Sequence, residues 1–197
     1  MRIAWFILIA GFLMSSVATA EDAFLSARAR ALMAKLKVKE FSDKELRDRR
    51  SGVLSEQRFK MAGDLVVTHE VIAGTLYEAS TARLNFSDQG GKPKGFAIAE
   101  YKKSAREAQV ALFERLVMNS MPLEMIADLY EIRRDGPGDI CIITKKQDRS
   151  GSRRVADESK TMFIRDNVLL SVCSEDDAVK AMDLARKMDQ MLVEGNE

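Results

Sequence analysis

The chain has 197 residues, of which 46% are hydrophobic, and it carries 31 Lys and Arg against 30 Asp and Glu. This composition is sufficient for a folded core and argues against global disorder, and the length fits one domain of ordinary size. The balanced charge gives no electrostatic reason to expect nucleic acid or an acidic membrane as a partner.

The first twenty residues, MRIAWFILIAGFLMSSVATA, have the pattern of a secretory signal peptide. Arg2 is followed by an apolar run over 3–14 and by Ala-Thr-Ala at 18–20, which is the expected order of basic start, hydrophobic region and cleavage site. The run is shorter than the roughly 20 apolar residues of a membrane span. We therefore expect export to the periplasm or the extracellular space and a soluble mature chain without a stable membrane anchor. An uncleaved N-terminal anchor is the alternative.

Residues 21–62 are expected to form a helical N-terminal segment, and its helix can dock separately from the rest of the chain. The helix is predicted from the pattern FLSARARALMAKLK at 24–37. Its leucines recur at helical spacing, which predicts an amphipathic helix. A second helix signal starts at Ser42, with Glu45 placed to complete a capping box. The charged stretch at 44–50 is expected to be a solvated helix face or linker.

An α+β domain is expected over 63–197. Residues 65–73 and 75–86 are rich in β-branched residues and predict two antiparallel strands divided by Gly74. A turn-rich loop at 88–95 precedes a further strand at 95–101, and a helix is predicted from Ser104 to Met118. A short helix and a strand are expected before the turn DGPGD, then a buried strand, and then a long exposed loop over 146–159.

The stretch TMFIRDNVLLSVC at 161–173 predicts a tight hairpin. Asp166 and Asn167 lie between two β-rich runs and tolerate the positive φ that two-residue hairpins require. This turn places Arg165 opposite Val168 and Phe163 opposite Leu170. A helix is expected to follow, with Ser174 as its cap, and the helices at 104–118 and 174–193 are expected to pack on one face of an antiparallel sheet.

The sequence contains no recognisable catalytic set. His69 is the only histidine, which excludes multi-histidine metal sites, and it lies on an alternating strand where a structural role is the usual one. No nucleophile-elbow motif, calcium loop or phosphate-binding glycine loop is present. We expect no catalytic residues, no metal and no cofactor.

Cys141 and Cys173 are the only cysteines, and in an exported protein two cysteines invite a disulfide. A bridge requires Cα atoms within about 7 Å. If the strand TMFIR lies between the two, they are about 10 Å apart, so a disulfide and buried free thiols both stay open as alternatives.

Four arginines are the candidate contacts to a ligand or partner: Arg165, Arg149, Arg153 and Arg154. Arg165 either pairs with an acid of the last helix or faces a ligand. The other three belong to a basic patch without aromatic residues, which argues against nucleic-acid stacking. A solvated loop and a partner-binding loop are the two interpretations of this patch.

The segments GDICII at 138–143, FIRDNVLLSV at 163–172 and DAVKAMDLARKMDQML at 177–192 resemble the C-terminal pattern of uncharacterised exported proteins. In that pattern a GD strand precedes an F-x-R-x-N-V hairpin and a helix ending in LA…D…L. The resemblance implies an α+β module outside the cytoplasm and carries no activity.

The expected function is that of an exported, non-enzymatic binding or interaction protein, with an unknown protein or small ligand as its partner. Two alternatives remain at this point. One is a small secreted or periplasmic hydrolase that uses scattered carboxylates, and the other is a protease-inhibitor-like domain that presents the loop at 146–159.

Overall fold

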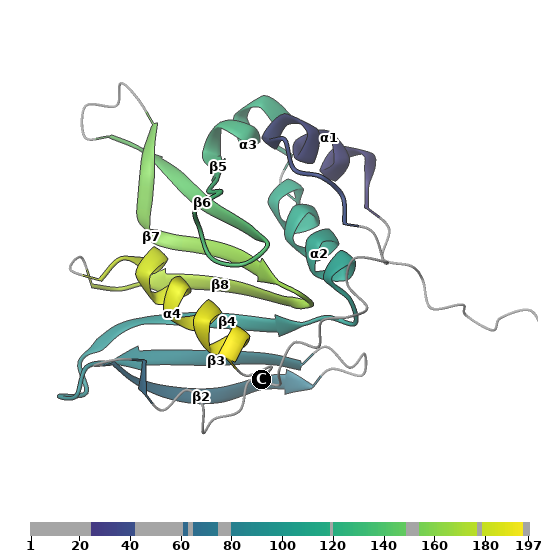
Figure 1. Ribbon diagram of the computed structural model, residues 1–197. Coiled ribbons are helices and arrows are strands. Elements are labelled where there is room, and N and C mark those ends of the chain that lie inside the picture. Colours follow the sequence, from purple (N-terminus) through teal and green to yellow (C-terminus); the bar gives the residue numbers. More distant parts are fainter. Residues whose placement is uncertain are drawn as a thin grey trace, which may run out of the picture.

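The computed structural model describes residues 25–41, 61–62, 65–74, 80–118, 120–148, 154–176 and 179–194. Within them, four helices accompany one antiparallel sheet of eight strands (Figure 1). The helices are α1 (Ala27–Leu36), α2 (Ala105–Val117), α3 (Leu123–Leu129) and α4 (Ala181–Glu194). The strands are β1 (Met61–Ala62), β2 (Leu65–Gly74), β3 (Ser80–Ser87), β4 (Pro93–Tyr101), β5 (Tyr130–Ile132), β6 (Ile140–Gln147), β7 (Arg154–Arg165) and β8 (Val168–Ser174). The predicted α+β class is confirmed. The second helix signal, from Ser42, lies outside the described residues.

The sheet consists of two meanders that meet at its centre. Strands β1 to β4 follow one another, strands β5 to β8 follow one another, and the sheet order is β1-β2-β3-β4-β8-β7-β6-β5. The junction is the antiparallel pair β4–β8, in register from Gly95 opposite Ser174 to Tyr101 opposite Val168. Strand β8, the last of the described strands, therefore joins the second meander to the first by pairing with β4.

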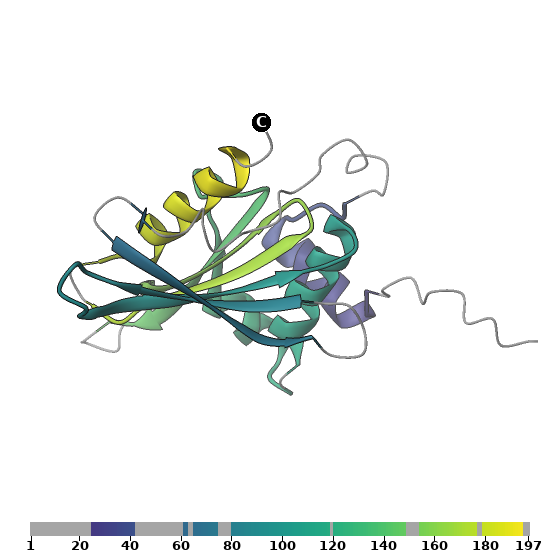
Figure 2. The ribbon, with the colours of Figure 1, turned by 90° about the horizontal axis from the view of Figure 1, so that it is seen from below.

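The helices cover both faces of the sheet, which corrects the expectation that they pack on one face. Phe163 and Leu170 belong to the core beneath α4, whereas their neighbours Ile164 and Leu169 belong to the core shared with α1, α2 and α3. Neighbouring strand residues point to opposite faces, so the consecutive apolar pairs of β7 and β8 require cover on both sides. Figure 2 shows α4 apart from the group formed by the other three helices.

Helix α1 does not dock separately. Its buried residues Ala29, Leu32 and Met33 are part of the same core as α2 and α3. Helix α2 begins where the sequence predicts, directly after Ser104. The Ser104 hydroxyl caps it by accepting from the Glu107 N–H at 3.1 Å, and the Glu107 carboxylate accepts from the Lys103 N–H at 2.9 Å. The prediction that Ser174 caps the last helix is wrong, because Ser174 still belongs to β8 and α4 starts at Ala181.

The hairpin between β7 and β8 has the predicted register, with Arg165 opposite Val168 and Phe163 opposite Leu170. Asp166 adopts a φ of 49°. The turn is tied to the end of β4, because the Asn167 side chain donates to the Lys102 carbonyl at 2.7 Å and the Lys102 N–H donates to the Asn167 carbonyl at 2.9 Å. Asn167 thus fixes the turn and also anchors it to the other half of the sheet.

Arg165 joins the sheet to α4. Its Nε and Nη2 each lie 2.6 Å from one carboxylate oxygen of Asp189, and its Nη1 lies 3.4 Å from Asp139. Asp189 also accepts from the Gly138 N–H at 2.9 Å, and Asp139 accepts from the Asp166 N–H at 2.9 Å. We call Arg165, Asp189, Asp139 and Gly138 the arginine latch. A bidentate arginine–carboxylate pair of this kind combines charge with fixed geometry.

Gly138 is required by the latch for steric reasons. Its φ is +74°, and a Cβ at this position would lie 2.2 Å from the Ile164 carbonyl oxygen. At Gly138 the turn before β6 packs directly against the end of β7. Only glycine permits both the positive φ and this close contact with the Ile164 carbonyl oxygen.

The predicted long loop over 146–159 is wrong for most of its length. Lys145, Lys146 and Gln147 of β6 pair with residues 154–156 of β7. The segment is polar because this end of the hairpin lies outside the core, where a strand needs no apolar face.

We expect Asp189→Asn to lower the free energy of unfolding by about 2–4 kcal/mol, because it removes one charge of a mostly buried pair. The side chains of Arg165 and Asp189 are only 18% and 13% exposed. Denaturant unfolding monitored by circular dichroism measures the loss.

The matched control is Asp183→Asn on the same helix, where the carboxylate is 59% exposed and pairs with Arg186 at 3.5 Å. This change should stay within about 0.5 kcal/mol. Equal losses in the two variants would show that the latch does not stabilise the fold.

Candidate functional site

A cleft opens where β7 and β8 separate. The two strands pair from Arg165–Val168 up to Lys160–Cys173, and no register pair continues beyond this point. The next residue after β8, Glu175, donates its N–H to the Lys94 carbonyl at 3.0 Å, so the chain follows β4 and leaves β7. The space between the diverging strands is the cleft.

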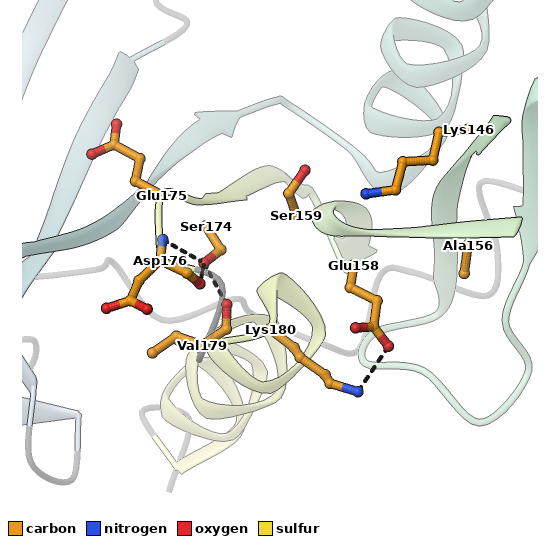
Figure 3. A pocket seen from close by; sticks show the side chains of 9 residues that line it. All are labelled: Lys146, Ala156, Glu158, Ser159, Ser174, Glu175, Asp176, Val179 and Lys180. Atoms are coloured by element: carbon orange, nitrogen blue, oxygen red, sulfur yellow. Dashed lines mark hydrogen bonds and ion pairs between the residues drawn. The ribbon is translucent and has the colours of Figure 1, made fainter. Parts of the chain in front are cut away.

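The cleft has a volume of about 270 Å³ and is mostly polar (Figure 3). Strands β6 and β7 supply one wall, the end of β8 supplies the other, and the residues before α4 form the floor. The lining residues are Lys146, Ala156, Glu158, Ser159, Ser174, Glu175, Asp176, Val179 and Lys180. The volume is near the lower end for small-molecule sites, which are commonly about 300–1,000 Å³.

Ser174 organises the floor of the cleft. Its hydroxyl lies 2.9 Å from the Asp176 carbonyl oxygen, contacts the Val179 carbonyl oxygen, and accepts from the Asp176 N–H at 3.3 Å. These bonds hold the backbone of Asp176 and of Val179 next to the end of β8, as Figure 3 shows. The serine that local sequence suggested as a helix cap therefore shapes the cleft.

Charged groups on the cleft walls are paired with one another. Lys180 lies 2.7 Å from Glu158, and Lys94 lies 2.7 Å from Asp176. The hydrogen bond from Lys94 to Asp176 is the largest cause of the raised pKa of Lys94, and it keeps the ammonium charged. The cleft therefore presents both signs of charge, with each lysine facing a carboxylate.

Ser159 lies beside a carboxylate that is poorly suited to activate it as a nucleophile. The Ser159 hydroxyl donates to Asp157 at 2.7 Å, and Lys146 lies 3.4 Å from the same carboxylate. Partial burial raises the pKa of Asp157, but the hydrogen bonds from Ser159 and the charge of Lys146 outweigh burial and lower the pKa overall. A carboxylate with a lowered pKa is a poor base for a serine hydroxyl.

His69 cannot supply the missing base. It lies on β2, opposite Leu84 of β3. Strand β2 is four positions from β7 in the sheet, a separation of about 19 Å at the usual strand spacing. Among the described residues, no group of three or more His, Cys, Asp or Glu side chains is placed to hold a metal ion.

The sequence-derived candidate arginines do not gather at the cleft. Arg165 is engaged in the latch, about 20 Å along β7 from Ser159. Arg154 pairs with Asp128 at 3.2 Å. Arg149 and Arg153 lie outside the described residues. The interpretation in which Arg165 pairs with an acid of the last helix is the one that the structure shows.

Cys141 and Cys173 are both free, which corrects the disulfide alternative. Strand β7 lies between their strands. Cys141 is opposite Phe163, whereas Cys173 is opposite Lys160, so the two are also displaced along the strands. Burial raises the pKa of Cys141 to about 12 and also raises the pKa of Cys173, which leaves both thiols protonated.

A second polar surface lies on the sheet face opposite α4. Phe96 of β4 is opposite Asn85 of β3 and Cys173 of β8. The Arg83 guanidinium lies 4.4 Å from the Phe96 ring centre, and the Arg83 Nε donates to Asn85 at 2.8 Å. Arg83 therefore covers the Phe96 ring, which is the only aromatic ring among these paired residues. We interpret this face as a solvated sheet surface.

Local sequence carried no signal for the cleft. Ser159 and Lys180 come from segments predicted to be a loop and a helix, and Ser174 was predicted to be a cap. They are brought together by the separation of β8 from β7, which depends on long-range strand pairing.

Comparison with known proteins places no further constraint on the site. No protein-family model, no curated protein and no solved structure matches the chain. Within the described residues, no helix has the length and apolar character required to cross a membrane.

We expect to detect two free thiols in the unfolded protein without any reductant. In the folded protein we expect only one thiol, that of Cys173, to react, and to react slowly. Half-exposed Cys173 should react more slowly than an unhindered cysteine at pH 8, because its raised pKa reduces the thiolate fraction. Buried Cys141 should react only on unfolding. Thiol titration with Ellman's reagent measures both, and Cys173→Ser should abolish the native reaction. Failure to detect thiols without reductant would contradict the structure.

Proposed function

We propose that the chain is an exported, non-enzymatic binding protein and that its ligand occupies the cleft between β7 and β8. The observation that carries this proposal is the separation of the two strands after the Lys160–Cys173 pair, which leaves a polar cleft of about 270 Å³. A sheet that continued its pairing would leave no such space.

The lining of the cleft supports binding over catalysis. Hydrogen-bonding groups converge from β6, β7, β8 and the start of α4, which is the arrangement of a recognition site. The serine nearest to a carboxylate has no base strong enough to activate it, since the pKa of Asp157 is lowered. Recognition of a polar ligand requires only these hydrogen-bonding groups and charges.

Export is proposed from the N-terminal pattern at 1–20, which lies outside the described residues. The ligand is then one that is available outside the cytoplasm. A role in binding also agrees with the paired charges of the cleft walls, because ion pairs at a surface can exchange partners at small cost.

Native mass spectrometry of the full-length protein, recovered from its expressing cells, tests the proposal. We expect an added mass on the unmodified protein and its absence in Ser159→Trp, because Ser159 lines the cleft and the larger side chain fills it.

The matched control is Lys160→Trp, on the adjacent residue of β7. Lys160 is exposed and is not among the cleft-lining residues. This variant should keep the added mass. A bare protein in every case, or a mass that persists in Ser159→Trp, would contradict binding in the cleft.

A further inference from the structure

Part of β7 lacks a strand neighbour on the side of the cleft. Residues 157–159 belong to β7 but take part in no register pair with β6 or β8. On the β6 side the register shifts between Ile143 and Lys145, so this part of β7 bulges. On the β8 side, β8 has already turned toward β4, and no described strand replaces it.

We propose that the cleft binds an extended peptide segment, which pairs with residues 157–159 of β7 in the place that β8 leaves. This inference rests on the proposed function and names its ligand class. Main-chain groups at a strand without a neighbouring strand are a template for another strand, and adding a strand is a common mode of peptide recognition. The Ser159 N–H donates to the Asp157 carboxylate at 3.2 Å, and it would exchange this bond for one to the peptide.

The dimensions of the cleft suit a short length of extended chain. Three residues of β7 span about 10 Å, and a paired strand would lie about 4.8 Å away. The far wall is the end of β8, where Ser174 and Asp176 face the same space. A cleft of about 270 Å³ is small for a large cofactor.

One ion pair joins the two sides of the cleft, and it can open when the peptide binds. Lys180 from the start of α4 meets Glu158 of β7 at 2.7 Å, and their side chains are 54% and 62% exposed. A pair this exposed contributes little to stability. When it opens, Lys180 and Glu158 become available to charged groups of the bound segment.

Main-chain pairing makes the recognition tolerant of peptide sequence. The described residues of the cleft offer polar groups, Ala156 and Val179, without a deep apolar side-chain pocket. We therefore expect that peptides of many sequences bind and that each main-chain hydrogen bond removed weakens binding by up to roughly tenfold.

The test is an NMR titration of the full-length protein with a pool of acetylated, amidated hexapeptides of randomised sequence. The matched probe is the same pool with every backbone nitrogen between residues methylated, which removes the main-chain donors of both strand edges and keeps the side chains. We expect the amide signals of residues 157–159 to shift with the first pool and to respond at least tenfold more weakly to the second. Ser159→Trp should abolish the shifts, and Lys160→Trp should retain them.

Three results would overturn the inference. Equal shifts with both pools would show that main-chain pairing does not hold the ligand, and no shift with either pool would show that peptides are not recognised. Shifts that depend on protein concentration alone would identify a second copy of the chain as the occupant. The proposed function is judged separately, by native mass spectrometry. If the protein carries a non-peptide mass that Ser159→Trp removes, the cleft still binds a ligand even though that ligand is not a peptide.

Discussion

The guanidinium of Arg165 is the point on which the C-terminal half of the structure depends. It holds Asp189 of α4 through two bonds of 2.6 Å and reaches Asp139 of the turn before β6. Helix α4 covers Phe163, Leu170 and the other residues of its core only if it stays against the sheet. Because β7 is buried on both faces, loss of this attachment would expose apolar surface that no described element could cover. The latch therefore holds α4 against the β7–β8 hairpin.

The two ends of β7 have different roles, one in folding and one in forming the cleft. At one end, Gly138, Asp139, Arg165, Asn167 and Asp189 make contacts that hold α4 and the two halves of the sheet together. At the other end, about 20 Å away, the strand loses its neighbour and the cleft opens. The latch also acts on the cleft indirectly, because α4 carries Lys180 and the floor residues into place. The residues of the arginine latch thus support the site without lining it.

Local signals in the sequence predicted local structure well. The Asp-Asn turn predicted the β7–β8 register, and the helix predicted from Ser104 starts there, because both features depend on residues a few positions apart. The consecutive apolar residues at 163–164 and 168–170 indicate a sheet that is covered on both faces, because neighbouring strand residues point to opposite faces. The polar stretch at 146–159 was mistaken for a loop because strands outside a core lose their apolar alternation. The cleft could not be predicted, since it arises where β8 leaves β7 for β4, a choice set by long-range pairing.

The most direct test of the latch is a double-mutant cycle on Arg165→Met and Asp189→Leu, with the free energy of unfolding measured for all four proteins. Each single variant leaves a mostly buried charge without its main partner, whereas the double variant removes both charges and restores apolar packing. We expect the double variant to recover at least half of the stability lost in the less stable single variant, with a coupling energy of about 1.5 kcal/mol or more. Losses that simply add in the double variant would show that Arg165 and Asp189 act independently and that the latch does not hold α4 to the sheet.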